Sequence, residues 1–271
     1  MRNKFLIIAI LLCSFANAQY VQHAYNFTLD NFPGVYGGKT EFKRFLRDHM
    51  VYPDVAIKEK TEGTVKIIFV VTSEGKSINA KISESVSHEI DQEALRLLSM
   101  IEWFPSRVGG SLVDITHSIE INFSISKYKK WVKERGFEKR LFNDIPSDTS
   151  LAVYETNDKP AVFFDKEKTY ADFIYSNLEY PEEARKQGVE GKINMTFIIE
   201  PNGAVSNIRI KDGGLGVGCD DEAIRVIGLT RWQPAVKNGK YIRFRMSYSM
   251  LFSVKNNFKD NSGGTQRTWG Q

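Results

Sequence analysis

The chain has 271 residues and a formal net charge of +4, and 42% of its residues are hydrophobic. This length and apolar content suit about two small domains, each with its own core. A nearly balanced charge lacks the strongly basic face of a nucleic-acid-binding protein, so we expect no nucleic-acid partner.

Residues 1–18 have the pattern of a secretory signal peptide. Positive charges at Arg2 and Lys4 precede the apolar run 5–12, and the small residues of 16–18 form a cleavage site. The run is shorter than the ~20 apolar residues that a membrane-spanning helix needs. We therefore predict an exported, soluble and periplasmic mature chain. An uncleaved anchor is the alternative.

Helical and strand patterns alternate after a mixed lead-in. The one-sided apolar residues of 40–50 predict a helix, which ends before a Tyr-Pro pair. Strands are predicted over 65–71 and 77–83, because apolar residues alternate around a Glu-Gly turn. A second helix over 90–101 and a long alternating strand over 113–123 complete the unit.

The same order of elements returns later in the chain. Tyr180-Pro181 repeats Tyr52-Pro53 at an offset of 128 positions, and Trp232 repeats Trp103 at an offset of 129. Turn residues, helix caps and apolar positions recur between these points. The period is far longer than the ~20–50 residues of solenoid repeats, so the chain is read as a duplicated small domain.

Each unit reads helix, strand, strand, helix, strand. We predict an α+β fold with two tandem domains, each a three-stranded antiparallel sheet with helices on one face. The expected boundaries are a first domain over 19–125, a basic linker over 126–150, a second domain over 151–255 and a disordered tail over 256–271.

Residues for catalysis or metal binding are not grouped in this sequence. The four histidines are dispersed, and Cys219, the single thiol once the leader is removed, occupies the apolar slot of Ile90 in the first unit. The Gly-rich stretch 212–218 precedes a helix, but the carboxylates that follow it would repel a phosphate. We expect no enzyme, no cofactor, no metal and no small-molecule substrate.

The final strand of each unit lies at a sheet edge in this interpretation, and an open edge is an aggregation hazard unless it is blunted or used. In the second unit the outward residues are Arg243, Arg245, Ser247, Ser249 and Leu251. The two arginines suit equally well a guard against aggregation and a contact for an acidic peptide that adds a strand.

The ordered set of motifs resembles the carboxy-terminal domain of TonB energy-transducing proteins. In the second unit the resemblance is carried by the following residues: Tyr180-Pro181, Ala184, Gly188, Glu190-Gly191, Asn202-Gly203, Cys219-Asp220, Ala223, Trp232, Pro234 and Asn238-Gly239. The first unit carries a matching set: Tyr52-Pro53, Ala56, Glu62-Gly63, Glu74-Gly75, Asp91, Ala94, Trp103 and Pro105.

This resemblance implies a Gram-negative periplasm and a domain that pairs a receptor segment beside its last strand. It implies partner-binding residues on that strand and just before the Tyr-Pro pair. They are Tyr241, Arg243, Arg245, Ser247, Ser249, Leu251, Asp114, Thr116, Ser118, Glu120, Asn177 and Glu179. A TonB transducer also has a membrane anchor and a long Pro-rich spacer, whereas this chain has eight prolines.

We therefore expect a periplasmic binding protein that captures outer-membrane TonB-dependent receptors or other envelope proteins, as an accessory to transport. One alternative is a structural envelope protein that self-associates or binds the cell wall. Another is a true energy transducer, if residues 1–18 are retained as an anchor.

Overall fold

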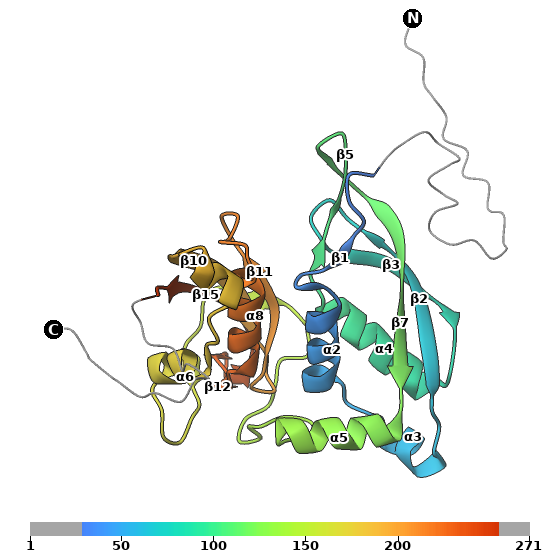
Figure 1. The fold of residues 1–271 in the computed structure, drawn as a ribbon. Coiled ribbons are helices and arrows are strands. Elements are labelled where there is room, and N and C mark those ends of the chain that lie inside the picture. The colour runs from blue at the N-terminus through green and yellow to red at the C-terminus, as the bar shows by residue number, and fades with distance from the viewer. Residues whose placement is uncertain (1–28, 255–271) are drawn as a thin grey trace, which may run out of the picture.

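The computed structural model describes residues 29–254, which form two lobes with separate hydrophobic cores (Figure 1). The predicted signal peptide and the predicted tail lie outside the described residues. Within 29–254 no helix has both the length and the apolar character that a membrane span requires.

The first lobe contains a three-stranded antiparallel sheet in the order β3-β2-β7. Its elements are β1 (Gly34–Val35), α2 (Gly38–His49), α3 (Asp54–Glu59), β2 (Gly63–Val71), β3 (Ser77–Glu84), α4 (His88–Met100), β4 (Trp103–Phe104), β5 (Ser106–Val108), β6 (Ser111–Val113), β7 (Ile115–Phe123) and α5 (Ile125–Arg135).

Alternation along the strands builds the first core. Val65, Ile67 and Phe69 of β2 are buried against the apolar stripe of α4, whose N-terminus is capped by Ser87. Burying one such aliphatic or aromatic side chain contributes about 1.5–3 kcal/mol, so this face is the main source of stability.

The second lobe repeats the plan and adds one short strand. Its elements are β8 (Val153–Tyr154), β9 (Val162–Phe163), α6 (Tyr170–Asn177), α7 (Glu182–Lys186), β10 (Gly191–Ile199), β11 (Val205–Ile210), α8 (Cys219–Leu229), β12 (Trp232–Gln233), β13 (Val236–Lys237), β14 (Lys240–Tyr241) and β15 (Arg243–Phe252).

The predicted α+β class is confirmed, and the second sheet differs from the first in one respect. Its order is β11-β10-β15-β8, and β8 lies parallel to the start of β15 at Arg243 and Phe244. The pair is too short to show as an apolar alternation, so nothing in the local sequence pattern predicts a strand there.

The basic stretch expected to be a linker packs along both lobes. Tyr128 and Trp131 of α5 belong to the first core, and Arg135 donates to the carbonyls of Arg47 and Met50 at 2.8 and 2.9 Å. The chain then follows the second lobe, where Tyr241 N–H donates to the Pro146 carbonyl at 2.8 Å. The domain boundaries stay a prediction.

The structural repeat extends to residues before the first helix of each unit, where the sequence shows no repeated motif. β1 pairs with β4, and β9, 128 positions later, pairs with β12 in the same way. The carboxylate of Asp30 accepts from Gly110 N–H at 2.7 Å, and that of Asp158 accepts from Asn238 N–H at 2.7 Å. The segment preceding each first helix is therefore a fixed part of its domain.

Candidate partner-binding edges

The strand β7 has one paired side and one open side. It pairs with β2 over nine residues, from Ile115 to Phe123, and no other strand of the described chain pairs with it. The predicted residues Asp114, Thr116, Ser118 and Glu120 are all exposed. Backbone N–H and C=O groups on this side are therefore available to a guest strand.

The inward face of β7 is occupied by core residues, as expected from its alternation. The ring of His117 packs edge-on against Phe69 and Trp103, with centroids at 5.7 and 5.5 Å. Burial lowers the pKa of His117, so the neutral ring is favoured in the fold. This half-buried histidine packs against the edge of the first core.

The corresponding strand β15 presents less open edge. Ser247, Ser249 and Leu251 are exposed in the way that the alternation predicted. Arg245 is half-buried, and its guanidinium lies 2.6 Å from the carboxylate of Glu102 in the first domain. The open part of this edge thus starts after Phe244, beyond the pairing with β8.

Two predicted contact residues, one at the start of β15 and one in β14, are buried. Arg243 is 4% exposed and donates to Glu200 and to the carbonyls of Met100 and Leu151. Tyr241 is 1% exposed, and its hydroxyl donates to Asp144. Both are corrected here to internal contacts, because the first domain and the chain before β8 cover this end of the sheet.

The segment before the second Tyr-Pro pair is held by two side chains of α8. Asn177 accepts through its carbonyl from Arg225 at 2.6 Å, and Glu179 N–H donates to Glu222 at 2.5 Å. The side chain of Glu179 is exposed and that of Asn177 is half-buried. Because Tyr180 packs on Phe252, this segment lies near the end of β15.

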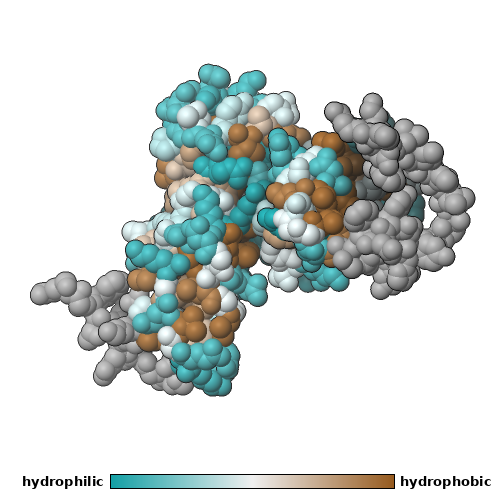
Figure 2. Space-filling model, turned by 90° about the horizontal axis from the view of Figure 1, so that it is seen from above, coloured by the Kyte–Doolittle hydropathy of each residue, from teal (hydrophilic) through white to brown (hydrophobic). Residues whose placement is uncertain are grey.

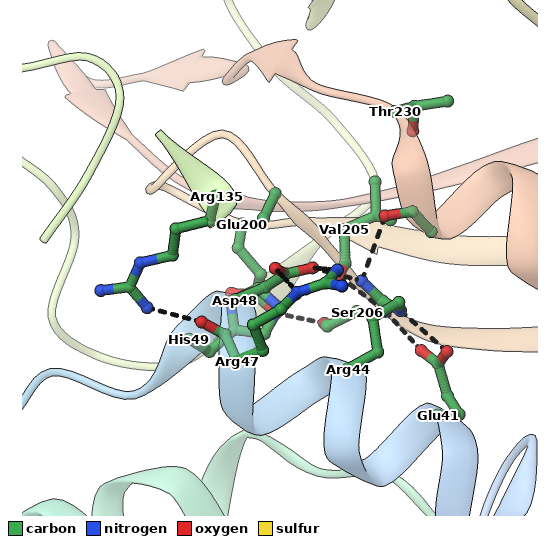
Figure 3. Close-up of polar contacts among 12 residues, drawn as sticks. Glu41, Arg44, Arg47, Asp48, His49, Arg135, Glu200, Val205, Ser206 and Thr230 are labelled. Atoms are coloured by element: carbon green, nitrogen blue, oxygen red, sulfur yellow. Dashed lines mark hydrogen bonds and ion pairs between the residues drawn. The ribbon is translucent and has the colours of Figure 1, made fainter. Parts of the chain in front are cut away.

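A buried polar network joins the two domains (Figure 3). Arg44 and His49 of α2 both donate to the carbonyl of Val205, each at 3.0 Å. The edge strand β11 is thereby closed by side chains of the first domain. Sequence patterns gave no sign of this contact, because it joins residues more than 150 positions apart.

The hydrogen bonds of His49 define its tautomer. Nε2 faces the Val205 carbonyl and donates, while Nδ1 accepts from the amide of Asn202 at 3.1 Å. Burial lowers the pKa of His49 to about 4, so the ring is neutral at physiological pH. A proton added at Nδ1 would face the Asn202 amide donor.

The Gly-rich stretch and Cys219 make contacts within the second domain. Asp220 accepts from the N–H groups of Leu215 and Gly216, which fills the Gly-rich loop with a carboxylate of the protein. Burial raises the pKa of the Cys219 thiol, and the nearby carboxylate of Asp220 raises it further. No three metal-ligating side chains converge within 29–254.

Residues 48–125 and 176–254 match the family model of the Gram-negative bacterial TonB protein C-terminal. The two segments cover more than half of the chain, and their starts and ends differ by 128 and 129 positions, the offsets of the repeat. The chain belongs to this family. It is a family of the Gram-negative envelope with a non-enzymatic role in TonB-related transport.

Two solved structures are similar to parts of this TonB-family chain. The Pseudomonas aeruginosa TonB CTD in solution is 31% identical, covers 29% of this chain and 81% of its own, and has a TM-score of 0.26. The Helicobacter pylori TonB-CTD is 22% identical, covers 31% of this chain and 77% of its own, and has a TM-score of 0.24. A comparison with curated proteins found no match.

Proposed function

We propose that this protein is a periplasmic binding module that captures extended segments of envelope proteins by strand addition. Outer-membrane TonB-dependent receptors are the foremost partners, and the module serves as an accessory to their transport. The observation that supports this most strongly is the open edge of β7, which is unpaired over nine residues in the described chain. Family membership supports the class of partner.

β7 is the principal docking strand in this proposal. A guest strand beside β15 finds the positions of Arg243 and Phe244 already occupied by β8, so it can use only the rest of that edge. Beside β7 it can form a full ladder. Main-chain hydrogen bonds then provide affinity, and Thr116, Ser118 and Glu120 provide selectivity.

The open half of β15 is a second and shorter docking site. Ser247, Ser249 and Leu251 line it, and Glu179 with Asn177 lies toward its far end. A partner that engages both edges would gain affinity through effective concentration without any new contact. Arg245 is tied to Glu102 and contributes mainly to the fit between domains.

Cysteine cross-linking tests the docking strand directly. Ser118 and Ser247 are equivalent by the 129-residue offset and both are exposed. Mature Ser118→Cys and Ser247→Cys proteins are incubated with peptides from receptor amino termini that carry one cysteine at successive positions. We expect mixed disulfides at alternate peptide positions, in higher yield at residue 118 than at 247. Buried Cys219 serves as the internal control.

Absence of cross-links at both sites with millimolar peptide would overturn the proposal. Concentration-dependent dimers in gel filtration, together with indifference to peptides, would favour the self-associating envelope protein instead. Sequencing the mature amino terminus decides the energy-transducer alternative, since it reports whether residues 1–18 are removed.

A further inference from the structure

A bulge in the second sheet binds an extended segment of the first domain. Asn207, with a left-handed φ of 50°, donates from its amide to the Met100 carbonyl at 2.9 Å. Its amide oxygen accepts from Glu102 N–H at 2.7 Å. One side chain thus bonds both groups that flank Ile101, in the manner of a residue in a parallel strand pair.

Charges complete this internal docking site. The carboxylate of Glu102 lies 2.5 Å from Arg209 and 2.6 Å from Arg245. The bound segment is therefore recognised by its backbone at residues 100–102 and by one acidic side chain. Around it, Thr196 is 5% exposed and Ser206 fully buried.

The first sheet has the same bulge at the equivalent place. Asn79 has a φ of 55°, and the register of β2 and β3 shifts there just as that of β10 and β11 shifts at Asn207. The offset between the two asparagines is 128, the offset of the duplication. In both sheets the bulge therefore places an asparagine at the same position of an edge strand.

The contacts that Asn207 makes have no counterpart at Asn79. Within the described chain no hydrogen bond reaches the Asn79 side chain, which is exposed. Ile68 and Ile78, the counterparts of Thr196 and Ser206, are 41% and 42% exposed. In the face drawn in Figure 2, apolar residues lie in separate groups among polar ones.

In the first sheet Lys81 occupies the position of Arg209, the residue whose positive charge pairs with Glu102 in the internal docking site. It stands 128 positions before Arg209, it is exposed, and no carboxylate of residues 29–254 pairs with it. We propose that the β3 edge around Asn79 is a second interaction surface. Its partner is an extended segment of another protein with an acidic residue in the place of Glu102 and an apolar residue beside it that can cover Ile68 and Ile78.

A second copy of this chain is the wrong partner. The second domain's counterpart of Glu102 is Arg231, which would meet Lys81 with the same charge. Arg231 also pairs with Asp48 of its own chain at 3.4 Å. Within one chain Arg44 donates to the Val205 carbonyl. The counterparts of these two residues are Asp172 and Ser77, so a carboxylate, which is an acceptor, would face a carbonyl, which is also an acceptor. Like charges and facing acceptors cost free energy, so head-to-tail assembly is disfavoured.

The probe is a capped peptide with the sequence of residues 98–104, Leu-Ser-Met-Ile-Glu-Trp-Phe, flanked by Gly-Ser pairs for solubility. Titration into ¹⁵N-labelled mature protein should shift the Asn79 side-chain amide and the β3 backbone amides. The Asn207 amide should not move, because its site is filled. Asn79→Gly keeps the left-handed backbone and should weaken binding.

Lys81→Glu should weaken binding by about fivefold, since it turns an exposed attraction into a repulsion. Lys129→Glu, an equal charge change on α5, should leave it unchanged. Full binding by both Asn79→Gly and Lys81→Glu, or no shift along β3 at millimolar peptide, would overturn the proposal. Shifts of receptor peptides along β7 belong to the proposed function, so either surface can fail without the other.

Discussion

Arg243 Nε lies 2.9 Å from Glu200 Oε2, and the two side chains are 5% and 1% exposed. Arg243 is the first residue of β15 and Glu200 directly follows β10, and the first domain covers this end of the sheet: Arg243 also donates to the Met100 carbonyl at 2.8 Å. Burial alone would raise the pKa of Glu200, but the guanidinium of Arg243 outweighs it and holds that pKa below its usual value. The face of the second sheet around Arg243, which would be exposed in an isolated domain, is therefore buried between the two domains.

Removing Arg243 is therefore expected to destabilise the protein strongly. Arg243→Met leaves the Glu200 carboxylate buried without a counter-charge, which costs about 3–5 kcal/mol. Urea unfolding followed by tryptophan fluorescence measures this loss. Arg245→Met, which breaks a half-exposed ion pair, should cost about 1 kcal/mol or less. Equal losses of unfolding free energy for the two variants would contradict the burial of Arg243 under the first domain.

Mild acid is expected to weaken the fold through His49. Its pKa is about 4 in the folded chain and about 6.5 when unfolded, so the unfolded state binds more protons between these values. The stability contributed by the neutral ring is complete above pH 6.5 and is lost as pH falls toward 4. The total is about 3 kcal/mol, because one pKa unit corresponds to about 1.4 kcal/mol.

Comparison with His49→Gln isolates this effect from other titrating groups. Glutamine can still donate to the Val205 carbonyl but does not titrate. Unfolding free energies at pH 7, 5.5 and 4 should show a steeper decline for the wild type. Parallel declines would mean that another group is responsible.

The turn at Gly75 tests the packing of the first hairpin. Gly75 has a φ of 78°, and an added Cβ would lie 2.3 Å from the Trp103 carbonyl oxygen. Gly109 also has a positive φ but faces open space. Gly109→Ala should cost about 1–2 kcal/mol for the backbone alone, and Gly75→Ala clearly more. Thermal unfolding distinguishes the two, and similar midpoints would refute the close approach.

The short strand β8 should limit access to β15. Val153→Pro removes a strand donor and should loosen the pairing with Arg243. We expect faster amide hydrogen exchange at Arg243 and Phe244, and more peptide cross-linking at Ser247→Cys, with no change at Ser118→Cys. Unchanged cross-linking at residue 247 would show that β8 does not restrict that edge.

Local patterns predicted much of this molecule. Alternation along 113–123 and 242–252 identified both final strands and most of their inward residues, because a strand's side-chain period is a local property. The repeated turn, cap and tryptophan positions identified two copies of one domain, and their order identified the family.

What covers each strand was decided only by the tertiary structure. Asn79 and Asn207 occupy equivalent bulges in the two sheets, yet one is exposed and the other binds the first domain's backbone. Arg243 alternates as an outward residue but lies under Met100. Sequence periodicity fixes the face of a strand on which a side chain lies, whereas burial depends on contacts between residues more than 100 positions apart, which leave no local pattern.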